Sequence, residues 1–281
     1  MTFRHKAADL AGSVLHGLGK RIDRFGTYAF LDARQAELGD VRPVDFEAVL
    51  YAFAAAKPGF SFIQIGAHKG EAGDPLRDGI RALSLRGVLV EPQPGPFDAL
   101  KAGYADQPQL SFEQAAIAEE SGTVRFYRVD PAFWARHGLR PGSDTEISSL
   151  KPEQIRFHVA LFGGDKLAAR ESEYLVCDVV PALTLADLQA RHDLPAPDLL
   201  QIDAEGFDDR IVRMIDWSRP PALVHYETVH LSEGDRLASW ALLRGRGYRL
   251  YSTDSYNTLA IRRGAGGDSR GPPLAESASS P

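Results

Sequence analysis

Short apolar segments alternate with helix-like segments through most of the chain, and this alternation restricts the fold more than any other feature. Each apolar segment follows a turn signal and ends at a polar residue or a glycine. The segments are FSFIQIG (60–66), RGVLVEP (86–92), LSFEQAAI (110–117), PDLLQID (197–203) and PALVHYE (221–227). Helix-like stretches lie at 96–104, 184–192 and 207–215. Strands that alternate with helices form a mostly parallel sheet with helices on both faces.

The C-terminal part of this pattern is different. Residues 248–262, YRLYSTDSYNTLAIR, read as two strands joined by a polar turn. Two strands joined so closely form an antiparallel hairpin. We therefore predict an α/β fold whose sheet is closed at one edge by a hairpin.

Composition and charge exclude several classes of protein. Hydrophobic residues make up 44% of the 281 residues, which is enough for a sizeable core. The chain has 38 acidic and 32 basic residues, and an acidic chain is a poor candidate for general nucleic-acid binding. Its single cysteine, Cys177, cannot form an internal disulfide. No segment approaches the ~20 apolar residues of a membrane span, and no secretory signal is evident, so we expect a cytoplasmic protein.

Two helices are expected before the alternating region. Apolar residues between positions 1 and 25 recur at spacings of three and four, and the opposite face is mainly basic. Such a helix either packs on the main domain, which we favour, or touches an anionic membrane surface. A second helix is predicted near Val44–Ala56, before the break at Lys57-Pro58-Gly59. We therefore assign residues 1–57 to an N-terminal helical extension.

The rest of the chain divides into a main domain at 58–263 and a tail at 264–281. The tail is rich in Gly, Ser and Pro and has few bulky residues, so we predict that it is disordered. Residues 131–170 interrupt the alternation of strands and helices. Long segments between strands often carry function, and we predict an insertion on the substrate side of the domain.

Two features after the first strands indicate a nucleoside ligand. Gly66 and Gly70 follow the first strand, where glycine lets the backbone turn sharply and approach a ligand, although a packing turn would use the same residues. Glu91 ends the next strand, 21 residues after Gly70. An acid at this place can accept hydrogen bonds from both ribose hydroxyls of an adenosine ligand, the alternative being an ordinary exposed glutamate.

The glycine pattern distinguishes between two classes of cofactor. A dinucleotide site uses G-x-G-x-x-G, whose second glycine makes room for the pyrophosphate. His68 occupies that position here. S-adenosylmethionine has no phosphate and needs only a looser turn, so this cofactor is favoured over a nucleotide-dependent oxidoreductase.

Further candidate residues follow the fourth strand. Asp203 closes this strand, and Glu205 lies in the turn that follows. Ligands of open α/β sheets bind beyond the carboxyl ends of the strands. These carboxylates could bind an ammonium group, position a substrate hydroxyl or cap the next helix. They could also hold a divalent cation, but no ligand spacing is distinctive, and we predict no metal site.

His225, Glu227 and His230 cluster at the end of the fifth strand. Either Glu227 or His230 could act as a general base, and the unperturbed histidine pKa of roughly 6.5 suits that role. The alternative is a solvated loop histidine.

Taken in order, seven stretches resemble the FkbM-type family of S-adenosylmethionine-dependent methyltransferases. They are FIQIGAHKG, VLVEPQP, AAIAEESGTVRFY, EISSL, ALTLADL, DLLQIDAEGFD and ALVHYE, within residues 60–250. The resemblance implies a Rossmann-like, seven-stranded methyltransferase sheet with helices on both faces, whose last strand is antiparallel. It implies that S-adenosylmethionine is bound by Gly66, Ala67, His68, Gly70, Glu91, Pro92, Ala116, Ile117 and Asp203. In this assignment the glycine turn wraps the methionine end, Glu91 binds the ribose, and Ala116 and Ile117 flank the adenine.

The sequence departs from the family pattern at three positions. Gln64 replaces the usual acid of the first strand, His68 replaces an asparagine of the glycine turn, and Gln201 replaces a lysine. The change at position 64 removes one partner for the ammonium group of the cofactor.

The resemblance and the strand-end residues together predict methylation of a hydroxyl on a sugar, a glycan or another polar metabolite. An alcohol must lose its proton as it attacks the methyl group, so a base must lie within about 3 Å of the oxygen. The candidates are Asp203, Glu205, Glu227 and His230. The alternative outside enzyme chemistry is a cofactor-binding or membrane-associated scaffold that uses residues 1–25. The sequence identifies neither the acceptor nor the oligomeric state.

Overall fold

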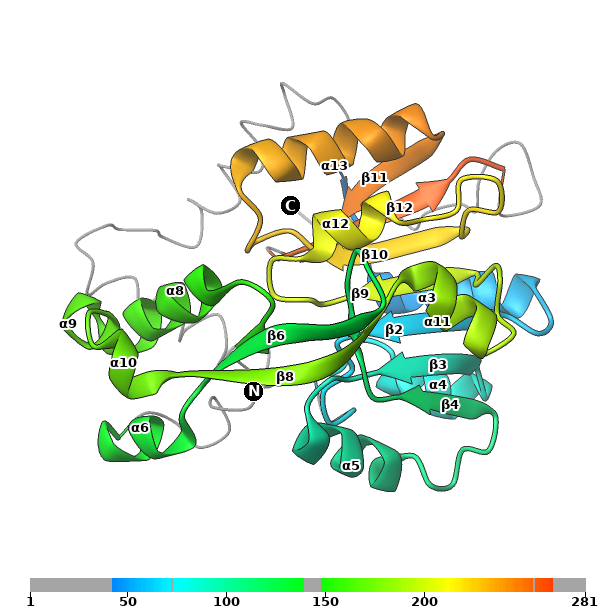
Figure 1. Ribbon diagram of the computed structural model, residues 1–281. Coiled ribbons are helices and arrows are strands. Elements are labelled where there is room, and N and C mark those ends of the chain that lie inside the picture. The colour runs from blue at the N-terminus through cyan, green and yellow to red at the C-terminus, as the bar shows by residue number, and fades with distance from the viewer. Residues whose placement is uncertain (1–41, 72, 139–147, 255, 265–281) are drawn as a thin grey trace, which may run out of the picture. The chain divides into compact units, whose positions relative to one another are not determined.

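The computed structural model describes residues 42–71, 73–138, 148–254 and 256–264 (Figure 1). Contacts divide the chain into two units. Among the described residues, the larger unit contains Arg42–Val124, Val180–Ala204 and the chain from Asp208 onward. The smaller unit contains Arg125–Val179 and the short turn Glu205–Phe207.

The larger unit is built on one mixed sheet. Its strands are β1 (Arg42–Pro43), β2 (Ser61–Ile65), β3 (Arg86–Val90), β4 (Leu110–Glu113), β9 (Leu199–Ile202), β10 (Leu223–Glu227), β11 (Tyr248–Ser252) and β12 (Asn257–Arg262). They lie in the order β1-β11-β12-β10-β9-β2-β3-β4. From β10 to β4 neighbouring strands are parallel, whereas β12 is antiparallel to both β10 and β11. The seven-stranded sheet with an antiparallel last strand is confirmed, and the two-residue strand β1 adds an edge beyond β11.

The order of the strands fixes where a ligand can bind. The chain runs outward from β2 through β3 to β4 and then crosses to β9 on the other side of β2. The carboxyl ends of β2 and β9 therefore form the topological switch point, where ligands of open α/β sheets bind.

Helices cover both faces of this sheet. On β10, His225 stacks on Phe46 of α3 (Phe46–Ala56) with ring centroids 4.1 Å apart. The next residue, Tyr226, shares a hydrogen bond of 2.9 Å with Ser239 of α13 (Glu233–Gly245). Because successive strand residues point to opposite faces, α3 and α13 lie on opposite sides of β10.

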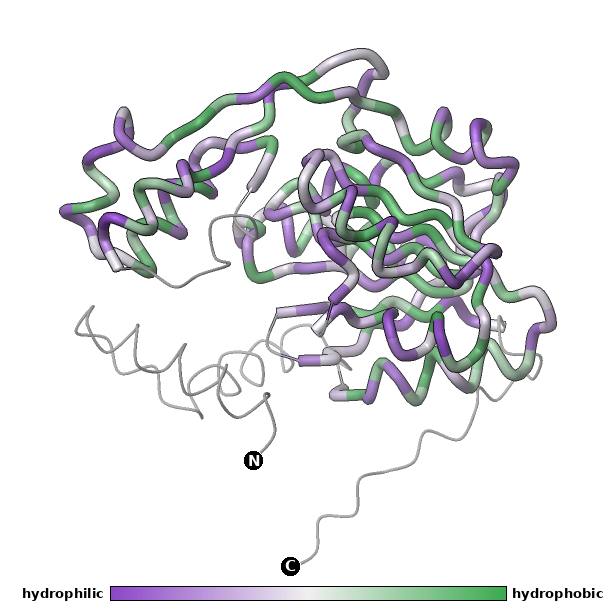
Figure 2. Tube along the Cα trace, turned by 90° about the horizontal axis from the view of Figure 1, so that it is seen from below, coloured by the Kyte–Doolittle hydropathy of each residue, from purple (hydrophilic) through white to green (hydrophobic). Residues whose placement is uncertain are grey.

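The face of α3 also carries α4 (Arg77–Leu83) and α5 (Pro94–Gly103), which share one hydrophobic cluster with β2 and β3. The remaining helices of the larger unit are α11 (Leu185–Arg191) and α12 (Asp208–Arg213). In Figure 2 the strands at the centre of this unit are mainly hydrophobic, whereas its outer helices alternate between hydrophobic and hydrophilic positions. This pattern is typical of helices that bury only one face.

The predicted helix near Val44–Ala56 is confirmed as α3. Asp45 caps its first turn by accepting a hydrogen bond from the N–H of Ala48 at 3.1 Å. Four residues at helical spacing, Phe46, Val49, Leu50 and Phe53, are buried in the sheet cluster. This helix is therefore part of the core of the larger unit.

A second sheet was not foreseen from the sequence. It contains β5 (Ala116–Ile117), β6 (Gly122–Val129), β7 (Ser148–Ser149) and β8 (Leu175–Leu183), in the order β5-β8-β6-β7. The prediction of one strand over residues 110–117 is wrong, because β4 ends at Glu113 and β5 pairs with β8 instead. The chain passes between the two units within β6 and within β8.

The smaller unit has its own core. Its helices are α6 (Pro131–Arg136), α8 (Pro152–Gly163), α9 (Asp165–Ala168) and α10 (Glu171–Tyr174). Their buried residues form one cluster, Val129, Phe133, Trp134, Ile155, Val159 and Tyr174. The described part of segment 131–170 is thus mostly helical, and its place on the substrate side stays a prediction.

Two predictions concern residues beyond those described. The helix over residues 1–25 and the disordered tail, apart from Gly264, lie outside the described residues, so the proposed domain boundaries stay predictions. Within the described residues, no helix is long and apolar enough to cross a membrane.

We predict that Leu50→Ala lowers the free energy of unfolding by about 2–5 kcal/mol, because it opens a cavity beneath a fully buried residue of α3. Glu47→Ala, on the exposed side of the same helix, should change it by less than about 0.5 kcal/mol. Urea unfolding of both variants measures the difference. Equal effects would contradict the placement of α3 in the core.

Candidate active site

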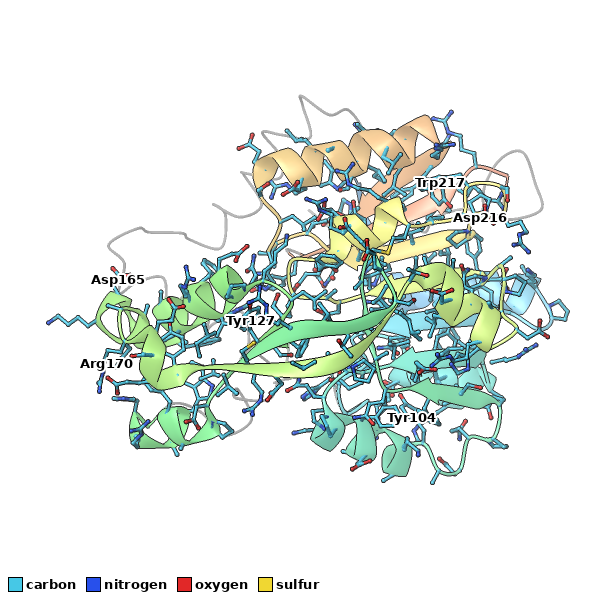
Figure 3. The ribbon with its side chains drawn as sticks, viewed as in Figure 1. Tyr104, Tyr127, Asp165, Arg170, Asp216 and Trp217 are labelled. Carbon is cyan, nitrogen blue, oxygen red and sulfur yellow. The ribbon has the colours of Figure 1, made fainter. Side chains whose placement is uncertain are left out.

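Two glycines fix the turn that follows β2. Gly66 has a φ of +77° and Gly70 a φ of +61°, in the left-handed region that favours glycine. A Cβ on Gly66 would lie 1.8 Å from the carbonyl oxygen of Asp203, and one on Gly70 would lie 2.5 Å from the ring of Tyr104, labelled in Figure 3. The N–H groups of Gly66 and Ala67 both donate to the last carbonyl of β3 at 3.0 Å. The turn is therefore packed closely against the ends of β3 and β9.

His68 lies at the centre of this turn with a φ of +45°. Asparagine and histidine are among the residues that adopt this conformation more often than most. The backbone thus explains how His68 replaces the asparagine of the family pattern. Its N–H donates to Oε2 of Glu91 at 3.0 Å, which joins the turn to the second strand.

Glu91 is held from two directions at the end of β3. Its Oε2 accepts the His68 N–H, and its Oε1 accepts the N–H of Gln93 at 2.8 Å. Only 4% of Glu91 is exposed. Burial is the main cause that raises the pKa of Glu91 to about 7, and the negative charge of Asp203 acts in the same direction.

Asp203 lies beside the glycine turn. Its N–H donates to the carbonyl of Ile65 at 3.0 Å, which continues the parallel pairing of β2 with β9 by one residue. Desolvation by the surrounding protein raises the pKa of Asp203 to about 6, and the charge of Asp74 contributes. The side chain retains exposed surface, so solvent moderates this shift toward the protonated acid.

A further pair of residues at the end of β2 was not predicted from the sequence. Gln64, which is 3% exposed, donates from Nε2 to Oδ2 of Asp74 at 3.0 Å. Burial also raises the pKa of Asp74. Gln64 stood out in the sequence as a departure from the family pattern, but no sequence signal indicated Asp74. The two residues are ten positions apart in the chain, and their contact depends on the loop between them.

The other residues assigned to the cofactor, Pro92, Ala116 and Ile117, are all buried. Pro92 is buried beside Glu91. Ala116 and Ile117 pair with Ala182 and Leu183 of β8, and they are 5% and 2% exposed. They belong to the second sheet rather than to the end of β4, and their contact with an adenine ring stays a prediction.

At the end of β10, Glu227 and His230 form a pair rather than the expected cluster of three with His225. Nε2 of His230 lies 3.6 Å from Oε2 of Glu227. His225 instead forms hydrogen bonds with Gln201 of β9 and with Thr253. Its burial lowers the pKa of His225 to about 4, so this histidine is neutral at working pH.

Glu205 is held within the smaller unit. It has a φ of +47°, and its carbonyl accepts a hydrogen bond of 2.7 Å from the hydroxyl of Ser149. Oε2 of Glu205 lies 3.7 Å from Nε2 of the buried His158. Lys151 donates to the carbonyl of Gly206, the next residue. The stretches that contain Ser149 and Glu205 are thus bonded to each other, and both belong to the family resemblance.

The strand-end residues of the larger unit fit an adenosine ligand that carries an amino acid. Glu91 accepts the N–H groups of His68 and Gln93, and the side chain of Gln93 also hydrogen-bonds to it. A carboxylate has about four acceptor positions, so Glu91 can still accept a hydrogen bond from a ribose hydroxyl. The carboxylates of Asp74 and Asp203 suit a cationic group on the same ligand.

We predict that Glu91→Gln makes the free energy of unfolding less dependent on pH. An acid whose pKa rises from 4.5 to about 7 on folding favours the native state at low pH, and this contribution is lost as the pH rises between these values. Between about pH 5 and about pH 8, the free energy of unfolding should fall by about 2–3 kcal/mol more in the wild type than in the variant. Urea unfolding at both pH values measures this, with the exposed Glu120→Gln as the control. Parallel curves for all three proteins would contradict the buried position of Glu91.

Comparison with known proteins gives a family and several distant structures. A family model described as "Methyltransferase FkbM domain" matches residues 64–250. The FkbM methyltransferase structure from Methylobacillus flagellatus KT has 13% identity and a TM-score of 0.41, and it covers 79% of this chain. This chain spans about half, 48%, of the length of that structure. The SAH-bound methyltransferase PaMTH1 from Podospora anserina has 12% identity and a TM-score of 0.35, with 77% of each chain covered.

No curated protein matches the chain. The family assignment depends on the family model, which covers more than half of the sequence and includes the glycine turn, Glu91 and Asp203. The predicted family is confirmed, and the chain belongs to the FkbM methyltransferase family.

Proposed function

We propose that this protein transfers a methyl group from S-adenosylmethionine to a hydroxyl of a sugar, a glycan or another polar metabolite. The observation that supports this cofactor is the geometry of Glu91, which binds the N–H of the glycine turn at the end of β3 and can still accept a hydrogen bond from a ribose hydroxyl. The carboxylates of Asp203 and Glu227 favour an acceptor with hydroxyl groups, because an ionised carboxylate only accepts hydrogen bonds. We propose a cytoplasmic location, because the single cysteine needs no oxidising compartment.

The residues of the chain have four tasks in such a reaction. S-adenosylmethionine, when bound, supplies an electrophilic methyl group on a sulfonium leaving group. The protein must orient this group, align the acceptor oxygen behind the methyl carbon and exclude water. It must also accept the proton of the hydroxyl, since an alcohol is a weak nucleophile.

Asp203 is our first candidate for the base. It stands beside the glycine turn with exposed surface, and its pKa is raised to about 6. A base with this pKa is ionised at pH 7–8 and closer to the working pH than an ordinary aspartate. The pair of Glu227 and His230 is the second candidate, because a carboxylate 3.6 Å from the imidazole would stabilise the ring once it has accepted a proton. Glu205 is the third, beside His158 in the smaller unit.

Asp203→Asn should reduce kcat by about 100-fold or more at saturating cofactor, while the melting temperature changes little. Methyl transfer to an acceptor found by screening hydroxyl compounds, sugars first, measures the effect. Asp98→Asn, an exposed change on α5, serves as the control. Full activity in Asp203→Asn would remove this residue from the candidates and favour Glu227 and His230.

The cofactor is tested by calorimetric titration with S-adenosylmethionine, S-adenosylhomocysteine and NAD. We expect micromolar binding of the first two and none of NAD. Glu91→Ala should weaken that binding by about tenfold or more, because charge-assisted hydrogen bonds to the ribose are lost. Glu120→Ala, which removes an exposed carboxylate, should have no effect. A folded wild-type protein that binds NAD, or binds none of the three, would contradict the proposal.

A further inference from the structure

Gln64 and Asp74 form a fixed polar pair at the end of β2 that the proposed chemistry has not used. Nε2 of Gln64 donates to Oδ2 of Asp74 at 3.0 Å, and the N–H of Leu76 donates to Oδ1 at 2.7 Å. The carboxylate is therefore held from both sides. Gln64 itself is 3% exposed and lies just before the glycine turn.

The amide oxygen of Gln64 has an unused acceptor position. An ionised carboxylate only accepts hydrogen bonds, so the NH₂ group of Gln64 must face Asp74 and its Oε1 must face elsewhere. Among the described residues, this buried oxygen has no hydrogen-bond partner. Buried polar atoms normally have partners, and an unpaired one at a binding site indicates a missing donor.

The surroundings of this pair favour a positively charged donor. The negative charge of Asp74 raises the pKa of Asp203, so the two carboxyl groups share one region of the strand ends. The pKa of Asp74 is itself raised, mainly by burial. The positive charge of Arg77 lowers this pKa, but it is the smallest of the effects that do so. A bound cation would stabilise both ionised acids.

We infer that Gln64 and Asp74 together bind the ammonium group of S-adenosylmethionine, which rests on the proposed function. An ammonium has three N–H donors, and this pair offers an amide oxygen and a carboxylate, with the negative charge of Asp203 beside them. The carboxylate that is absent from position 64 is thus supplied by Asp74, ten residues later in the chain. Gln64 acts as the residue that positions it.

A purely structural role for Asp74 is the competing explanation. Its bond to the N–H of Leu76 shapes the loop before α4, and a misshapen loop would disturb the whole cofactor site. The two roles differ in one respect. A loop defect weakens every adenosine ligand, whereas a lost ammonium contact weakens only ligands that carry the amino acid.

The experiment compares S-adenosylhomocysteine with 5′-methylthioadenosine, which contains the adenosine and lacks the amino acid. Asp74→Asn keeps an oxygen for the Leu76 N–H and removes the charge. We expect binding of S-adenosylhomocysteine to weaken by about 10- to 100-fold and binding of 5′-methylthioadenosine to change by less than about threefold. Asp78→Asn removes the same charge from an exposed position on α4 and should leave both affinities unchanged.

A double substitution tests whether the carboxylate can be moved. Asp74→Asn combined with Gln64→Glu exchanges the amide and the carboxyl, while it retains both the net charge and the possibility of a hydrogen bond between them. We expect this protein to bind S-adenosylhomocysteine within about threefold of the wild type. Thermal unfolding without ligand establishes whether each variant is folded. If Asp74→Asn is not folded, the double variant provides the test.

Three results would overturn the inference. Unchanged binding in Asp74→Asn, with normal binding by the wild type, would remove Asp74 from the site and leave the proposed function intact. Equal weakening of both ligands would assign Asp74 to the loop alone. Failure of the wild type to bind either ligand would overturn the inference and the proposed function together.

Discussion

The close approach of β2 to β9 is the contact on which the site depends. These strands run parallel and adjacent, and Gly66 meets the carbonyl of Asp203 with no room for a Cβ. The approach forces the chain into a left-handed turn after β2, and the turn places the N–H of His68 on the carboxylate of Glu91. One backbone contact therefore brings the ends of three strands together at the switch point of the sheet.

Three acidic residues with altered pKa values lie in this region. Asp74, Glu91 and Asp203 all have raised pKa values, and burial is the first cause for each. Acids with perturbed pKa values gather at functional sites, and these three could receive hydroxyl donors and a cation. Methyl transfer from a sulfonium cofactor would use both, and the FkbM family membership agrees with it.

The sequence was sufficient for the parts of the fold whose residues are buried on both faces. Strands such as β2, buried throughout, appear as continuous apolar runs, and the glycines and Glu91 follow them at short range. Strands β6 and β8 were missed because most of their residues are exposed or only partly buried, which removes the apolar signal. Asp74 was missed for another reason. Its contact with Gln64 depends on how a loop folds back, and no local pattern encodes that.

A crystal structure of the protein with S-adenosylhomocysteine would test the central claim most directly. The account predicts that the ribose of the ligand hydrogen-bonds to the carboxylate of Glu91, with the amino group of the ligand between Gln64 and Asp74. A ligand bound away from the ends of β2 and β3, or one whose ribose makes no contact with Glu91, would contradict it.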